Sequence, residues 1–142
     1  MEQSFHHLLL ITETLFQKKV VGQAAEMGLL PGQSKILDYL QEHDGCEQKA
    51  LGQVFCLEAA TVTGILQRME QAGLVRRQVR EGNRKSQYVY LTPSGREAAV
   101  QVRQLFSSCE SSALEGLSPE QIRQLLELLA QIYQNLTKEA NR

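Results

Sequence analysis

The sequence predicts a mainly α-helical fold with one small β-hairpin. Three features support this: long stretches whose apolar residues recur every three or four positions, one β-rich stretch at residues 75–91, and Gly or Pro at most boundaries. The chain has 142 residues, the length of one domain, and its 42% hydrophobic and 22% charged residues suffice for a buried core. We expect one domain over residues 1–142.

The first half is expected to form four helices. An amphipathic helix is predicted over residues 5–27 and ends at Gly28. Pro31 and Gly32 form a turn before a second helix at residues 33–42. Two shorter helices follow, over residues 48–55 and 59–72. The fourth buries Val62, Ile65, Leu66 and Met69, and Gly73 ends it.

The outer face of this fourth helix has an unusual composition. It carries small or hydrogen-bonding residues rather than many charges: Thr61, Thr63, Gly64, Gln67 and Arg68. Such a face is typical of a helix that lies in a groove.

A hairpin is expected next, with strands at residues 75–80 and 87–91 around a Gly/Asn turn at 81–86. The residues available for its inner face are Val75, Val79, Val89 and Leu91. A fifth helix opens with Thr92-Pro93 and runs to about Glu115, burying Ala98, Ala99, Val102, Leu105, Phe106 and Cys109.

The last helix begins at Ser118-Pro119-Glu120-Gln121, which has the pattern of a capping box. Its apolar residues form a wide stripe: Ile122, Leu125, Leu126, Leu129, Ile132, Tyr133 and Leu136.

Charge is distributed unevenly along the chain. The net charge is only −1, yet residues 68–103 hold eight basic and three acidic side chains. The basic residues of the hairpin region are Arg76, Arg77, Arg80, Arg84 and Lys85. Two short helices followed by a basic hairpin indicate a winged helix-turn-helix, in which the second helix enters the major groove and the hairpin contacts the backbone or the adjacent minor groove. A solvated, charged hairpin is the alternative interpretation of these basic residues.

Three segments carry a more specific resemblance: residues 48–52 (QKALG), 60–75 (ATVTGILQRMEQAGLV) and 90–95 (YLTPSG). In order and spacing, residues 45–95 resemble the DNA-binding lobe of the MarR (multiple antibiotic resistance regulator) family. The long first helix and the two closing helices are also similar to that family's layout. The wing turn departs from it, since Asn83-Arg84-Lys85 stands where members usually carry Asp, any residue, then Arg.

The resemblance implies a homodimeric, cytoplasmic regulator, a repressor released from a pseudo-palindromic operator on double-stranded DNA by a small aromatic or anionic effector. It implies a DNA-binding lobe at residues 33–92 and dimerisation regions at 5–27 and 93–138. We expect the DNA contacts to come from Gln48, Lys49, Thr61, Thr63, Gln67, Arg68, Arg76, Arg80, Arg84 and Lys85. We expect the dimer contacts to come from Phe5, Leu8, Leu9, Leu125, Leu129, Ile132 and Leu136.

Other functions are less well supported. No glycine-rich phosphate loop, GxSxG or HExxH motif is present, so we expect neither an enzyme nor a cofactor. Around His43, residues 43–47 form the one local cluster of candidate metal ligands, and we expect polar surface there and no metal. No apolar run approaches the roughly 20 residues of a membrane span, and no secretory signal is expected.

Two alternatives stay open. One is a regulator that senses thiol oxidation through Cys109, Cys46 or Cys56, although the first helix, where oxidation-sensing members of that family carry a cysteine, has none. The other is a winged helix that serves protein contacts only, which an acidic wing would favour.

Overall fold

The computed structural model describes residues 3–141, and of residues 83 and 84 only the backbone. Its elements, in chain order, are α1 (Phe5–Glu26), α2 (Gln33–Glu42), β1 (Cys46–Glu47), α3 (Gln48–Phe55), α4 (Ala59–Gln71), β2 (Val75–Arg80), β3 (Asn83–Leu91), α5 (Pro93–Ala113) and α6 (Pro119–Ala140). The mainly α-helical fold with a small β wing is confirmed. The helix boundaries lie close to those predicted, because Gly and Pro mark them locally.

The chain divides into two compact units, Met1–Cys109 and Glu110–Arg142. The core of the first unit is centred on α2, whose Ile36, Leu37 and Leu40 are fully buried. Leu51 of α3, Leu66 and Met69 of α4, and Val102 of α5 pack into the same core. One apolar cluster therefore holds the helix-turn-helix and the base of the hairpin together.

The sheet contains a strand that the sequence did not reveal. β1 pairs antiparallel with β3 through Cys46↔Val89, which gives the strand order β1-β3-β2. β1 spans only two residues, too few to show an alternating pattern, so only the pairing identifies it.

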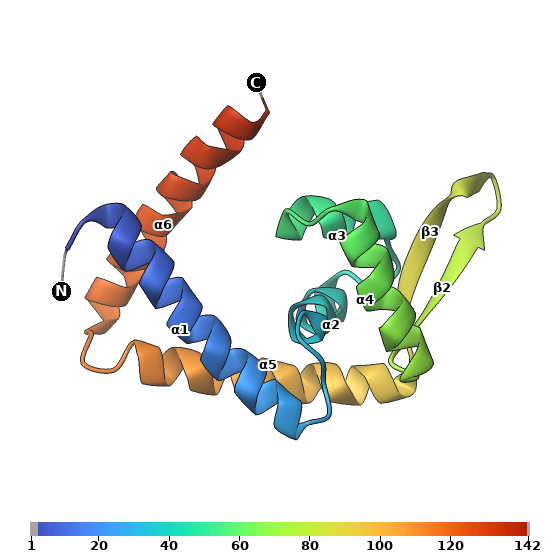
Figure 1. Cartoon of the computed structure of the whole chain (residues 1–142), viewed down its shortest axis with the longest axis horizontal. Coiled ribbons are helices and arrows are strands. Elements are labelled where there is room, and N and C mark those ends of the chain that lie inside the picture. The colour runs from blue at the N-terminus through green and yellow to red at the C-terminus, as the bar shows by residue number, and fades with distance from the viewer. Residues whose placement is uncertain (1–2, 142) are drawn as a thin grey trace. The chain divides into compact units, whose positions relative to one another are not determined.

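The hairpin differs from the prediction at two points. β3 begins at Asn83, so the turn is limited to Glu81 and Gly82, and Gly82 adopts the left-handed φ of 86°. Val79, predicted on the inner face, is 47% exposed, whereas Val75 and Val89 are buried. The face is the expected one, but the hairpin extends beyond the core, so Val79 has no helix to cover it. Figure 1 shows the hairpin running alongside α4.

A close backbone contact attaches α5 to the hairpin. The Thr92 hydroxyl donates to the Gly73 carbonyl at 2.6 Å and accepts from the Gly95 N–H at 2.9 Å. Thr92 thus serves as the N-cap of α5. A Cβ on Gly95 would lie 1.9 Å from the Leu74 carbonyl oxygen, so only glycine fits there.

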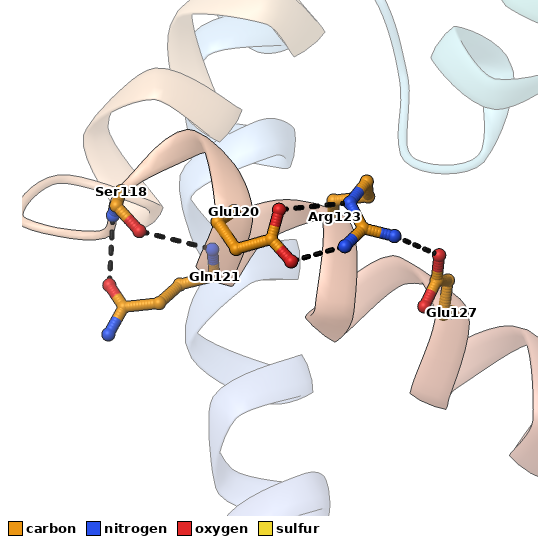
Figure 2. A network of polar contacts seen from close by, with 5 residues as sticks. All are labelled: Ser118, Glu120, Gln121, Arg123 and Glu127. Atoms are coloured by element: carbon orange, nitrogen blue, oxygen red, sulfur yellow. Dashed lines mark hydrogen bonds and ion pairs between the residues drawn. The ribbon is translucent and has the colours of Figure 1, made fainter.

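α6 belongs to the second unit, and its predicted start is confirmed. The Ser118 hydroxyl accepts from the Gln121 N–H at 3.1 Å, while the Gln121 side chain accepts from the Ser118 N–H at 2.9 Å. Arg123 then donates to Glu120 and Glu127, one turn before and one turn after it (Figure 2). The capping box and these ion pairs stabilise α6 through contacts between residues of the helix and its N-cap.

Both terminal helices carry exposed apolar side chains. On α1, Phe5 is 61% exposed, and Leu9, Leu10, Ile11 and Leu15 are also exposed. On α6 no residue is buried, and the stripe residues Leu126, Leu129, Tyr133 and Leu136 are all exposed. The stripe predicted from the sequence therefore lacks a covering surface within its unit.

Within residues 3–141, no single helix has the length and apolar character needed to cross a membrane. One bent pair, α3 with α4 at 118°, meets that test by length and composition alone.

Candidate nucleic-acid interface

The outer face of α4 is available for contacts. Val62, Leu66 and Met69 point into the core and leave Thr61, Gln67 and Arg68 exposed on the other side. In the described part of the chain, these three side chains have no hydrogen bond or ion-pair partner. Gly64 lies between them in sequence, and the space around it is open except for the Arg68 guanidinium, 3.8 Å from where a Cβ would stand. The face therefore has little side-chain bulk at its centre, and its hydrogen-bond donors and acceptors are unpaired.

A polar network lies next to this face and joins three elements. Arg77 of β2 donates to Glu70 of α4 at 2.6 Å and to Gln48 of α3 at 3.0 Å. The Gln48 amide in turn donates to the Thr63 hydroxyl of α4 at 2.9 Å. The Arg77 side chain is only 17% exposed, so this network is partly shielded from water.

This network changes the interpretation of two predicted DNA contacts. Gln48 and Thr63 are both half-buried and bonded to each other, so they position α3 against α4. Their predicted DNA contacts stay predictions. The importance of Arg77 was missed, because the sequence shows it as one basic residue among five in the hairpin region. The sequence did offer a signal for this pair: Glu70 lies near the end of α4, and Arg77 follows four residues after Gly73.

The hairpin presents its basic residues in different ways. Arg76 lies over the Tyr90 ring, 4.7 Å from its centroid, and donates to Gln78 at 2.6 Å. Lys85 is exposed near the tip. Arg80 instead folds back on the sheet, where it lies 3.9 Å from the Tyr88 ring centroid and donates to the Gly45 carbonyl at 2.9 Å. The side chain of Arg84, also predicted to contact DNA, lies outside the described residues.

A cleft of about 590 Å³ separates the wing from the N-terminal ends of α3 and α4. Its basic lining residues are Lys49, Arg77 and Lys85, and its described lining includes no acidic side chain. The exposed Lys49 and Lys85 thus place positive charge at the start of α3 and near the wing tip, which favours a polyanionic ligand.

The three cysteines lie in different environments. Cys109 is fully buried, with its sulfur 3.5 Å from the Gln23 amide oxygen. Cys46 is half-buried, and burial raises the pKa of its thiol. Cys56 is exposed and adopts a left-handed φ of 53° in the turn between α3 and α4. A buried or high-pKa thiol reacts slowly, so Cys56 has the most accessible thiol of the three.

Asp44, one of the candidate metal ligands, has a structural role. Its carboxylate accepts from the Leu91 N–H at 2.8 Å and pairs with Arg96 at 2.5 Å. Among the described residues, no three His, Cys, Asp or Glu side chains are grouped to hold a metal ion.

Known proteins resemble the chain in sequence and in fold. The model of the MarR family matches residues 29–87. The transcriptional regulator HosA of Escherichia coli O127:H6 (strain E2348/69 / EPEC) is 27% identical over 128 residues, which cover 89% of this chain and 92% of that protein.

Two solved structures share the fold and contain DNA. One is a Listeria monocytogenes protein assigned to the MarR family of transcriptional regulators, complexed with 26mer DNA (TM-score 0.88, 19% identity, covering 98% of this chain and 92% of that one). The other is the S. aureus MepR–DNA complex (TM-score 0.84, 21% identity, covering 95% and 99%).

These matches agree with the geometry of the interface. The family match spans α2, the helix-turn-helix and most of the hairpin, which are the elements that bring the exposed face of α4 beside the basic wing. Neither the match nor the site indicates an enzyme. The chain matches the MarR family model over residues 29–87 and has the winged helix-turn-helix fold of the transcriptional regulators it resembles.

Proposed function

We propose that this regulator is a cytoplasmic homodimer that represses transcription by binding a pseudo-palindromic operator and is released by a small ligand. The observation that carries the proposal is the exposed face of α4, whose unpaired Thr61, Gln67 and Arg68 lie on the helix next to a basic wing. The DNA-bound structures that share its fold support this proposal.

Direct reading of bases falls to α4. An arginine pairs with the two acceptors on the guanine edge, a glutamine pairs with the adenine edge, and a threonine contacts phosphate or a thymine methyl group. Arg68, Gln67 and Thr61 supply one of each. The small side chains at Ala60 and Gly64 let the helix backbone approach the groove closely.

Phosphate contacts fall to the basic residues around the cleft and on the wing. Lys49 lies in the first turn of α3, where the helix N-terminus also attracts anions. Lys85 and Arg76 extend the positive surface along the hairpin. These contacts position the protein on the duplex and make its affinity depend on salt.

The dimer follows from the exposed apolar residues of the terminal helices. An apolar stripe in water favours burial against a partner, and a second copy supplies an identical stripe. Two recognition helices in such a dimer read half-sites about 10 bp apart, centre to centre. An effector that binds better to a dimer with wrongly spaced recognition helices releases the DNA. By resemblance, that effector is a small aromatic or anionic molecule.

The test compares binding of the purified protein to DNA from upstream of its own gene with binding to a scrambled duplex of equal length, at several salt concentrations. We expect Arg68→Ala to weaken specific binding and change the preferred sequence, and Lys85→Ala to weaken all binding and lower the salt slope by about one. Lys18→Ala, which removes one charge from α1, is the matched control and leaves both unchanged. The proposal would be contradicted if the protein bound the upstream duplex no more tightly than the scrambled one, and if selection from a random pool also gave no duplex that binds more tightly.

A further inference from the structure

Arg80 is the last residue of β2, and its side chain, although exposed, lies across the sheet. Its guanidinium lies over the Tyr88 ring of β3, 3.9 Å from the ring centroid. Two of its nitrogens, Nε and Nη2, lie 3.1 and 3.0 Å from the Tyr90 hydroxyl, and Nη2 also donates to the Gly45 carbonyl at 2.9 Å. One side chain therefore joins β2, β3 and the residue that precedes β1.

The position of Arg80 along the hairpin gives this contact its importance. Regular pairing of β2 with β3 continues to Val79↔Gln87, and the next pair, Arg80↔Asn83, is out of register. The wing tip at residues 81–86, which carries Lys85, projects from this irregular point. The pairing of the tip with the rest of the hairpin is therefore interrupted at Arg80 by this shift of register.

The acceptor side of the contact is closely packed. Gly45 adopts a left-handed φ of 81°, and a Cβ there would lie 2.8 Å from Cε1 of Tyr90 and 3.2 Å from Nη2 of Arg80. The Gly45 N–H also donates to the Val89 carbonyl at 2.8 Å, so its backbone is held on the edge of β3. Gly45 is therefore a fixed point on the body of the protein, to which Arg80 is attached.

We propose that Arg80 is a positioning residue that anchors the base of the wing tip and so places Lys85 against DNA, without itself contacting phosphate. This inference rests on the proposed DNA-binding function and replaces the sequence-based expectation that Arg80 contacts DNA. Arginine suits this role because its planar group stacks on a ring while donating sideways in fixed directions, which lysine cannot do.

The test uses Arg80→Lys, which keeps the charge and loses the planar fork, and Tyr90→Phe, which removes the acceptor and keeps the ring. In the free protein, hydrogen exchange at the amides of residues 79–87 is expected to be faster in both variants, with exchange in α2 unchanged. Arg103→Lys on α5, whose arginine pairs with Asp38 and Glu42, is the matched control and leaves wing exchange unchanged. Unchanged wing exchange in Arg80→Lys would overturn the proposal.

The second measurement is binding to a duplex selected by the wild-type protein from a random pool. Arg80→Lys and Arg80→Ala are expected to lower the affinity about three- to tenfold without changing the salt slope. When Lys85 is already alanine, Arg80→Lys is expected to lower the affinity for this duplex less than twofold, because the wing tip no longer carries the lysine that Arg80 positions. If Arg80→Ala lowers the salt slope of binding by about one while Tyr90→Phe leaves the affinity unchanged, Arg80 instead contacts a phosphate and the proposal is overturned. If the wild type selects no duplex, the proposed function fails, while hydrogen exchange still decides whether Arg80 anchors the wing.

Discussion

Gly95→Ala is expected to destabilise the protein severely, although it adds one methyl group. The added Cβ would stand 1.9 Å from the Leu74 carbonyl oxygen, and ordinary contact begins at 3.4 Å, so α5 and the hairpin must separate by about 1.5 Å. That movement also strains the bond from the Gly95 N–H to the Thr92 hydroxyl. Overpacking costs about 1–3 kcal/mol and a lost N-cap about 1 kcal/mol, so we expect the free energy of unfolding to fall by about 2–4 kcal/mol.

The assay is urea unfolding followed by circular dichroism at one fixed protein concentration, because the apparent stability of any oligomer depends on protein concentration. Gly64→Ala is the matched control: it makes the same substitution inside a helix where the nearest atom would be 3.8 Å away. It is expected to stabilise the protein by up to about 1 kcal/mol, since alanine favours a helix. A loss below about 0.5 kcal/mol in Gly95→Ala would refute the steric argument.

Three further predictions concern other parts of the chain. Leu129→Asp is expected to convert the proposed dimer to monomer in analytical ultracentrifugation and to weaken DNA binding. Leu128→Asp, off the apolar stripe, is expected to leave the proposed dimer intact, and a dimeric Leu129→Asp protein would contradict the role proposed for α6. Cys56→Gly is expected to raise the free energy of urea unfolding by about 0.5–1 kcal/mol by relieving the left-handed φ of 53°, and a decrease would count against that reading. At pH 8, iodoacetamide is expected to modify Cys56 before Cys46 and Cys109 by mass spectrometry, because burial raises the pKa of Cys46 and encloses Cys109. Faster modification of Cys46 would contradict that order.

The tertiary structure leaves the thiol-sensing alternative weaker than the sequence did. Two of the three cysteines are shielded, and the exposed one, Cys56, lies in the turn between α3 and α4. The structure also distinguishes the basic residues of the wing. Arg76, Arg80 and Lys85 are exposed, and the first two of these also contact other side chains of the hairpin, whereas the Arg77 side chain is only 17% exposed and pairs with Glu70.

The sequence by itself determined the order and ends of all six helices and the presence of the hairpin. The signals for these are local: apolar residues at helical spacing, the box from Ser118 to Gln121, and Gly or Pro at the boundaries. Each helix is specified by residues three or four positions apart, and its end by a single residue such as Gly73 with its left-handed φ. The resemblance of residues 45–95 to a known family depended on the same local order and spacing.

Only the tertiary structure decided which side chains are free. Val79 belongs to the inner face of the hairpin by its alternation, yet the core ends before it. Arg77 and Arg80 are equivalent to their basic neighbours in composition, but Arg77 donates to Gln48 and Arg80 donates to Gly45, 29 and 35 positions away along the chain. Such pairings depend on how distant segments pack, and local sequence patterns do not predict that packing.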